Sequence, residues 1–150
     1  MRVVVQKVKN ASVKVNNRLV GEIKNGLVVL AGYESSDNSE DISWMVQKII
    51  KMRIFDDSEN KLNFSILDVN GEILLISQFT LHASVKKGNR PSYIKATDSK
   101  KAKQMYDQTI REFETVLKRK ISTGKFGANM EVSLVNNGPV TITIDTKKKE

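Results

Sequence analysis

Tight-turn pairs set between short alternating runs constrain this chain more than any other feature of its sequence. In the first third, valines alternate with polar residues, and Asn16-Asn17 and Asn25-Gly26 separate the runs. Asn and Gly tolerate the positive φ angles of two-residue turns, so such pairs typically join antiparallel strands. The pattern predicts a meander of four strands near residues 2–8, 11–16, 18–24 and 27–33.

The apolar spacing then changes from that of a strand to that of a helix. After Ser39, which can cap a helix, apolar residues recur at helical intervals from Ile42 to Ile50. A second helix is predicted at about 98–120, with Asp98 as its cap. Because each helix has a single apolar face, each needs a sheet to pack against.

The remaining segments predict more strands. Residues 53–55 form a short strand, and residues 64–69 and 72–79 flank Asn70-Gly71, a pattern typical of a hairpin. The last strands are expected at 130–135 and 140–144. With about eight strands and two helices, the predicted class is α+β: a curved, mainly antiparallel sheet or barrel with two packed helices, forming a single domain over residues 1–150.

Composition excludes several kinds of function. The chain has no cysteine and one histidine, His82, which excludes disulfides, a cysteine nucleophile and a zinc site built from thiolates or several histidines. We therefore expect no metal and no cofactor. The net charge of +8 favours a polyanionic partner such as nucleic acid. No apolar run approaches the roughly 20 residues that span a bilayer, so we expect no membrane partner and a cytoplasmic location.

Polar residues end one apolar strand abruptly. Ser77-Gln78-Phe79-Thr80-Leu81 follows four apolar residues and precedes a long polar loop, an arrangement typical of active sites. An equally consistent interpretation is that Thr80 only satisfies nearby backbone groups. A serine-hydrolase mechanism needs a histidine base, and only His82 is near. We interpret His82 as a surface loop residue instead.

Two other segments carry possible chemistry. Asn137-Gly138-Pro139 can hold two carbonyl groups in a fixed orientation, although taken alone it is better explained as a simple turn. The loop with Lys86, Lys87, Arg90 and Tyr93 suits an RNA phosphate or a terminal nucleotide, and a solvated charged loop explains it equally well. The carboxylates between Asp56 and Glu72 are interpreted as a solvated surface.

Together these segments resemble a known family. Residues 77–81 and 137–141 match the SQFTL and NGPVT motifs of bacterial and eukaryotic D-aminoacyl-tRNA deacylases letter for letter. Further matching blocks extend the resemblance over nearly the whole chain. They are Met1 to Gln6, Ala11 to Val13, Arg53 to Phe55, Lys61 to Asn63, Lys86 to Gly88, Arg90-Pro91, Thr123 to Ala128 and Met130.

The resemblance implies hydrolysis of the ester between a D-amino acid and its tRNA. It places catalysis at Ser77, Gln78, Phe79 and Thr80, where the backbone N–H groups of Phe79 and Thr80 would stabilise the developing oxyanion. Phe79 is expected near the terminal adenine, and the ribose 2′-hydroxyl is expected to help activate water. Thr80 is given a positioning role, and Lys86, Lys87 and Arg90 are expected to bind the tRNA.

The same resemblance implies a homodimer. Gly138 and Pro139 are expected to be joined by a cis bond and to enter the partner subunit's active site, where their carbonyls accept hydrogen bonds from the substrate amino group. An L-side chain would collide with this backbone, whereas glycyl-tRNA would be accepted. Met130 is expected to contact the substrate. Lys7 stands where many relatives have Arg, which alters any bracing of Gly138-Pro139.

Two alternatives remain at this point. Relatives that clear L-alanine from the wrong tRNA share the fold but alter both motifs, and the intact motifs here argue against that activity. A non-catalytic basic RNA-binding barrel belongs to a different class, and charge and strand pattern alone do not exclude it. Turnover of a D-aminoacyl-tRNA at catalytic enzyme concentration distinguishes a deacylase from a non-catalytic RNA-binding protein.

Overall fold

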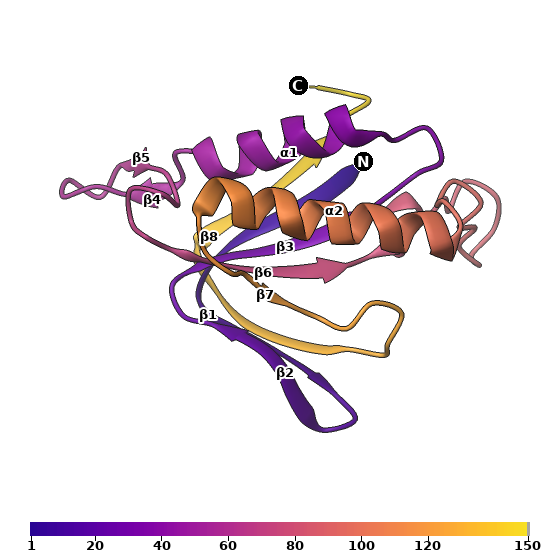
Figure 1. Cartoon of the computed structure of the whole chain (residues 1–150), viewed down its shortest axis with the longest axis horizontal. Helices are drawn as coiled ribbons and strands as arrows, with labels where there is room; N and C mark the ends of the chain where they lie inside the picture. The colour runs from indigo at the N-terminus through magenta and orange to yellow at the C-terminus, as the bar shows by residue number, and fades with distance from the viewer. Residues whose placement is uncertain (150) are drawn as a thin grey trace.

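A long bent strand, β1 (Arg2–Val15), organises the sheet in the computed structural model, which describes residues 1–149 (Figure 1). Two α-helices lie together on one side of the sheet in this part of the chain. The other elements are β2 (Arg18–Ile23), β3 (Gly26–Gly32), α1 (Ser39–Lys51), β4 (Phe55–Asp56), β5 (Leu62–Phe64), β6 (Glu72–Ser77), the short 3-10 helix η1 (Phe79–His82), α2 (Ser99–Leu117), β7 (Ser122–Thr123) and β8 (Glu131–Asp145).

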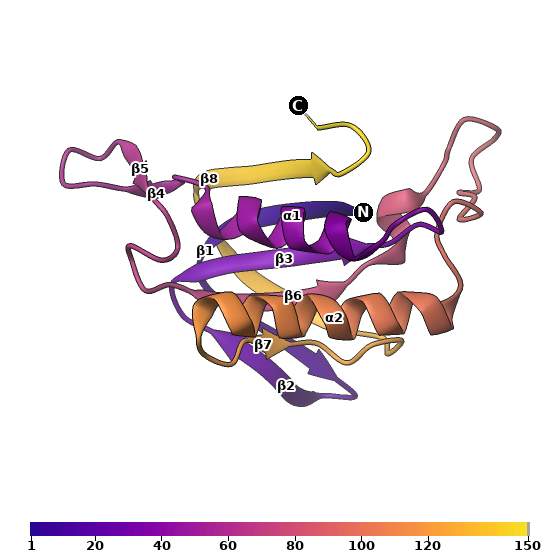
Figure 2. The same ribbon diagram turned by 45° about the horizontal axis from the view of Figure 1, so that its top comes forward.

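β1 lies between different neighbours along its length. Residues 2–8 pair with β3 and residues 11–15 pair with β2, while the 15-residue strand β8 follows the opposite edge of both halves (Figure 2). All three pairings are antiparallel, whereas β3–β6 and β6–β7 are parallel. The expected α+β class, with a curved and mainly antiparallel sheet and two packed helices, is confirmed.

The predicted meander is partly wrong. Residues 2–8 and 11–16 were expected as two strands, but β1 runs through them without a break, because β8 pairs with both parts. β3 then returns to the first half of β1 instead of pairing with β2. Likewise, the two strands expected at 130–135 and 140–144 form the single strand β8.

The hairpin predicted at Asn70-Gly71 is also wrong. Residues 65–70 form turns, in which Asp68 accepts hydrogen bonds from the Ser65 N–H and hydroxyl at 2.7 and 2.6 Å. Asn70 has a positive φ of 50°, and the Gly71 N–H donates to the Ile66 carbonyl at 2.9 Å. The chain then enters β6, which pairs with β3 in parallel. A local turn signal carries no information about such a distant partner.

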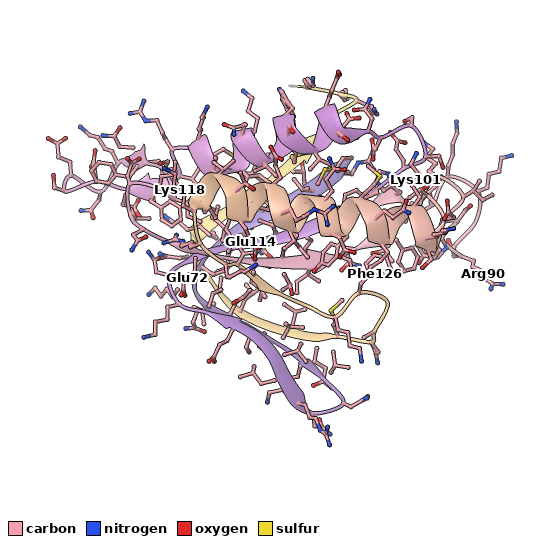
Figure 3. All side chains as sticks on the ribbon, in the orientation of Figure 1. Glu72, Arg90, Lys101, Glu114, Lys118 and Phe126 are labelled. Carbon is pink, nitrogen blue, oxygen red and sulfur yellow. The ribbon has the colours of Figure 1, made fainter. Side chains whose placement is uncertain are left out.

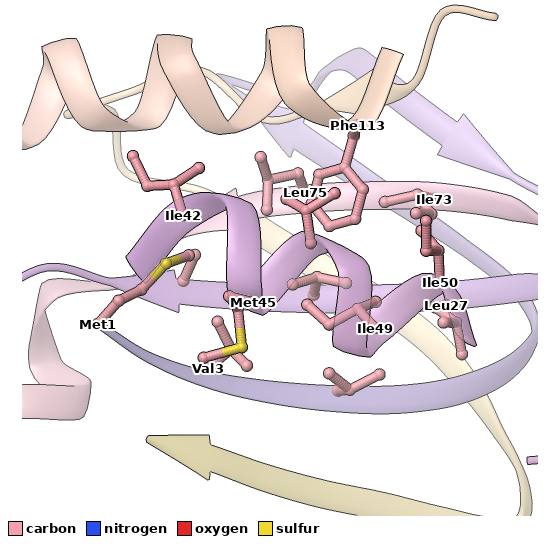
Figure 4. Close-up of a cluster of buried hydrophobic side chains, with 14 of the residues drawn as sticks. Met1, Val3, Leu27, Ile42, Met45, Ile49, Ile50, Ile73, Leu75 and Phe113 are labelled. Atoms are coloured by element: carbon pink, nitrogen blue, oxygen red, sulfur yellow. The ribbon is translucent and has the colours of Figure 1, made fainter. Parts of the chain in front are cut away.

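Both helices pack one face against the sheet. Asn38, not Ser39, caps α1, because its side chain accepts from the Glu40 and Asp41 N–H groups at 2.8 and 3.2 Å. Asp98 caps α2 as predicted and accepts from the Lys101 N–H at 3.0 Å. Figure 4 shows Met45 and Ile49 of α1 among the buried side chains. α2 ends at Leu117, earlier than expected, since Lys118 takes the left-handed conformation that terminates helices.

The opposite face of the sheet covers a second buried cluster. Val8, Val13, Val28, Leu74 and Ile76 meet there as β2 and β7 curl toward each other. The Ser122 hydroxyl donates to the Glu22 carbonyl at 2.7 Å, which ties the two edges. No helix within residues 1–149 has the length and hydropathy to cross a membrane.

Candidate active site

A cavity of about 580 Å³ opens where the parallel strands β3 and β6 end. Ala31 and Gly32 of β3 and Ser77 of β6 form its floor, and the first turn of α2 and the loop after β7 form its walls. Ligands commonly bind at the carboxyl ends of parallel strands, because the loops that follow diverge there. The predicted residues Ser77, Gln78, Phe79 and Met130 all line this cavity.

Two backbone donors just after β6 make no hydrogen bond within the described chain: that of Phe79, which lines the cavity, and that of Thr80, which follows it and is not one of the lining residues. The Gln78 N–H donates to the Ala31 carbonyl at 2.7 Å, and the chain then turns into η1. Gln78 provides no side-chain cap, because its Nε2 donates to Thr80 Oγ1 instead. Among residues 1–149, no acceptor faces the N–H groups of Phe79 and Thr80. Two adjacent donors at a cavity wall can stabilise a developing negative charge.

His82 differs from the prediction. It is 2% exposed, in the turn of η1 that packs against the end of β3, and is not a surface loop residue. Gly32 leaves the space for it, since a Cβ there would lie 3.1 Å from His82 Cδ2. Its Nε2 has no hydrogen-bond partner in the described part of the chain, and no hydrogen bond joins it to Thr80 there. The structure therefore does not assemble a threonine–histidine pair.

Three lining residues lacked any chemical signal in the sequence. Tyr33, Thr97 and Phe126 contribute to the cavity walls. The Tyr33 hydroxyl lies 2.9 Å from Thr109 Oγ1, and burial raises the pKa of Tyr33, so this phenol stays neutral. Only Phe126 falls within a segment that the family resemblance marks.

Met130 is held at the cavity by a close backbone approach. A Cβ at Gly124 would lie 2.5 Å from Met130 Sδ, so a larger residue at position 124 would displace this flexible thioether. The sulfur and methyl groups of methionine pack adaptably against irregular apolar surfaces. Met130 therefore shapes the wall that faces the strand ends.

The second motif forms a bulge far from the cavity. Gln6 pairs with Thr141 and Val8 with Asn136, so residues 137–140 of β8 stand opposite Lys7 alone. Gly138 and Pro139 are both exposed, and a cis peptide bond joins them as expected. Lys7 pairs with Leu27, five residues before the cavity residue Gly32, a separation of roughly 16 Å along β3. Figure 1 shows this bend of β8 at the opposite end of the sheet from the loop after β7.

Contacts of Asn136 and Lys7 hold the bulge in place. The Asn136 amide donates to the carbonyls of Lys7 and Val140 at 3.0 and 3.1 Å, which closes the loop at its base. The Lys7 side chain is 1% exposed and donates to Asp56 at 2.9 Å. A Cβ on Gly138 would lie 3.6 Å from Lys7 Cε. Lys7 therefore supports the bulge, while Asn136 is a bracing residue that the sequence analysis missed.

The expected tRNA-binding cations lie beyond the cavity. Lys86, Lys87 and Arg90 are exposed in a loop that the Ser84–Ser92 pair closes with backbone hydrogen bonds of 2.8 and 2.9 Å. Figure 3 shows Arg90 extending into solvent at the end of the molecule where Phe126 lies. Within residues 1–149, no three His, Cys, Asp or Glu side chains gather as a metal site.

Comparisons with known proteins identify the family. A family model described as D-Tyr-tRNA(Tyr) deacylase matches residues 4–145. A relative from Flavobacterium psychrophilum, named D-aminoacyl-tRNA deacylase, is 53% identical over 150 residues, the whole of both chains. A solved structure named c-Myc DNA Unwinding Element Binding Protein has a TM-score of 0.92 and 37% identity and covers 97% of this chain and 98% of its own. A probable eukaryotic D-amino acid tRNA deacylase shares the fold, with a TM-score of 0.82 at 18% identity over 95% of this chain and 97% of its own. The chain therefore belongs to the D-Tyr-tRNA(Tyr) deacylase family of enzymes that hydrolyse the ester bond of D-aminoacyl-tRNA.

Proposed function

We propose that the cavity holds the terminal adenosine and the ester of a D-aminoacyl-tRNA, with Ser77 to Thr80 as the reacting wall. When water attacks the ester carbonyl, negative charge develops on its oxygen. The free N–H groups of Phe79 and Thr80 are the donors available at that wall. Preorganised backbone donors of this kind stabilise the transition state more than the ground state.

No side chain of this wall acts as the nucleophile in this proposal. Thr80 Oγ1 accepts a hydrogen bond from Gln78, and no hydrogen bond joins it to His82 within residues 1–149. The tRNA itself supplies a hydroxyl next to the ester, the 2′-OH of the terminal ribose, which helps to activate the attacking water. Thr80 then orients Gln78 and the start of η1, which keeps both backbone donors in place.

Chiral selection comes from a second copy of the chain. Gly138 and Pro139 lie roughly 16 Å along the sheet from the cavity of their own chain, too far to touch its substrate. In a homodimer, the exposed bulge of one subunit enters the cavity of the other. Its carbonyls accept hydrogen bonds from the substrate amino group, and an L-side chain collides with the backbone. Glycyl-tRNA has no side chain to collide and is a second substrate.

The free backbone donors beside a cavity, without a nucleophile–base pair, carry this proposal. The direct test measures turnover of D-, L- and glycyl-tRNA by a small amount of enzyme over a range of enzyme concentrations. We expect multiple turnovers of the D- and glycyl-substrates, none of the L-substrate, and specific activity that falls as the dimer dissociates. Equal turnover of the D- and L-substrates, or full selective activity from a folded monomer, would contradict it.

Nucleic-acid binding without turnover is the second candidate. The net charge of +8 and the likeness to a protein named for binding a DNA unwinding element favour it. This candidate predicts affinity for DNA and RNA regardless of the aminoacyl group. Binding without hydrolysis of any aminoacyl ester would support it against the deacylase proposal.

A further inference from the structure

Two exposed aromatic rings stand at the mouth of the cavity. Phe79 and Tyr93 both line it, although 57% and 39% of their surfaces remain exposed. Their ring centroids are 5.0 Å apart at an interplanar angle of 70°. In such an edge-to-face pair, one ring points its edge at the other, so aromatic faces stay open to a further flat group.

The backbone on both sides of Tyr93 is held in place. On one side, Ser84 and Ser92 exchange hydrogen bonds, and on the other the Ala96 N–H donates to the Tyr93 carbonyl at 2.9 Å. The Thr97 N–H then donates to the Tyr33 carbonyl at 3.0 Å, which fastens this segment to the end of β3. The ring of Tyr93 is thus presented at the cavity mouth by an anchored segment.

Exposed cations adjoin residues of the cavity along the chain. Lys95 and Lys125 are exposed and adjoin the cavity residues Ala96 and Phe126, and the loop with Lys86, Lys87 and Arg90 precedes Tyr93. The cores of protein interfaces are depleted of such charges. Surfaces that bind single-stranded nucleic acid instead combine cations for the phosphates with aromatic rings for the bases.

We propose that Phe79 and Tyr93 form a stacking subsite for the base of the nucleotide that precedes the terminal adenosine. The Phe79 ring then faces that base and not the terminal adenine that the family resemblance implied. This inference rests on the proposed function, because it takes the adenosine and its ester to occupy the cavity. The polynucleotide chain then leaves through the mouth, and its next base meets the open aromatic faces there. The phosphate between the two nucleotides lies among the exposed lysines that adjoin the cavity residues.

The test compares substrates with and without that base. Tyr93→Leu, Tyr93→Phe and the control Ile94→Ala, which alters an exposed residue outside the cavity lining, are assayed on three D-aminoacyl esters. These are an acceptor minihelix, the same minihelix with an abasic penultimate nucleotide, and adenosine alone. We expect Tyr93→Leu to raise KM for the intact minihelix about tenfold with little change in kcat. Tyr93→Phe and Ile94→Ala should match the wild type.

The shorter substrates identify what Tyr93 recognises. Tyr93→Leu should leave KM for the adenosine ester unchanged and should have little effect on the abasic minihelix. Equal losses on all three substrates would show that Tyr93 contacts the adenosine itself and would overturn the subsite. An unchanged KM for the intact minihelix would overturn it as well. Dissociation of the dimer by Tyr93→Leu, seen by sedimentation, would show that the patch is an interface between copies of this chain.

A binding measurement separates this inference from the proposed function. The affinity of uncharged minihelices, with and without the penultimate base, is measured by fluorescence anisotropy for wild type and Tyr93→Leu. The subsite predicts that removing the base weakens wild-type binding and hardly changes binding of the variant. If that pattern holds while no ester is hydrolysed, the deacylase proposal fails and the base subsite stands. If the base makes no difference to wild-type binding, the subsite is rejected whether or not the ester is cleaved.

Discussion

The end of β6 and the bulge of β8 carry the two motifs of this chain and differ in nearly every physical respect. The end of β6 borders a cavity and has two backbone donors without acceptors in the described structure. The bulge at residues 137–140 is exposed at Gly138 and Pro139, and none of its residues lines that cavity. The backbone N–H groups of the first region can stabilise an oxyanion, whereas the second region offers a rigid, exposed backbone.

The difference shows why neither region suffices alone. In the proposed mechanism, the backbone donors act on the ester carbonyl, which is the same in D- and L-substrates, so they would accelerate hydrolysis without distinguishing the two. The bulge has no reacting group, but a fixed backbone can collide with one enantiomer. A selective hydrolase needs both regions at one substrate, and the length of β3 separates them within one chain.

Gly138→Ala should have the largest effect on turnover and on D/L selectivity. Gly138 has a φ of +121°, and an added Cβ would lie 2.9 Å from Val140 Cγ2, so the bulge must shift. A displacement of about 1 Å at a reacting site can lower turnover about 100-fold. We expect a loss of that order in kcat/KM for the D-substrate, together with weaker rejection of the L-substrate.

The fold should survive this change, because Gly138 is exposed and, of the bulge residues, Val140 alone packs against a buried cluster. Circular dichroism and thermal unfolding serve as the control. A folded Gly138→Ala enzyme with wild-type rate and selectivity would remove the bulge from the mechanism.

Neutralising the basic loop should affect binding and spare selectivity. In the triple variant Lys86→Ala, Lys87→Ala, Arg90→Ala, we expect tRNA affinity to fall roughly tenfold and the salt dependence of binding to become up to about three units shallower. The ratio of D- to L-turnover should persist, because we assign the selection to the bulge and not to this loop. A salt titration of affinity measures the effect, and an unchanged slope would show that this loop is merely solvated.

Lys7→Met tests the support of the bulge, because it changes the residue next to Gly138 and leaves residues 137–140 intact. The buried Lys7 stem lies below Gly138 and its ammonium group pairs with Asp56, so a methionine of similar length keeps most of the packing. We expect unfolding free energy to change by less than about 1.5 kcal/mol. Rejection of the L-substrate should weaken about fivefold, as the backbone becomes less rigidly placed.

Asp56→Asn is the matched control for Lys7→Met. It removes the charge of the half-exposed partner but leaves the Lys7 stem under the bulge. A similar loss of L-rejection would assign the bracing to the Lys7–Asp56 ion pair, whereas selectivity close to that of the wild type would show that this ion pair does not hold the bulge. If Lys7→Met itself keeps full selectivity, the bulge is held by Asn136 and the backbone alone.

Thr80→Ala should have the smallest effect. Its hydroxyl contacts Gln78 rather than a base, so we expect kcat to stay within about threefold of the wild type. Loss of a true nucleophile would lower kcat roughly 10⁴-fold or more. A substrate that ends in 2′-deoxyadenosine is the companion, and it should react far more slowly with both enzymes. An inactive Thr80→Ala enzyme with normal turnover of the deoxy substrate would favour covalent catalysis by threonine.

Local patterns predicted the local features of the fold. Asp98 caps α2 as expected, and the polar end of β6 does border a cavity. The Asn70-Gly71 hairpin failed, because the parallel pairing of β3 with β6 depends on contacts distant in sequence. His82 was misplaced for a similar reason, since the space beside Gly32 that accepts it exists only after folding.

The sequence indicates the two motifs of the site but not how they are placed relative to each other in the fold. The two motifs were evident from residues 77–81 and 137–141, yet no spacing in the sequence indicates that β3 keeps them apart. Tyr33 and Thr97 reach the cavity from segments whose composition is ordinary. Asn136 looks like a turn residue in sequence, and only the pairing of β1 with β8 shows that its amide closes the bulge.

Mixed dimers test most directly whether one subunit completes the cavity of the other. One chain carries Gly138→Ala, and the other carries Ala128→Trp, which fills the cavity that Ala128 lines. Both homodimers should be weak or inactive. The mixed dimer should regain about half of the wild-type activity with full D-selectivity, because one intact cavity receives one intact bulge. If each chain completed its own site, no intact pair would exist, and a mixed dimer no more active than the two homodimers would contradict the account.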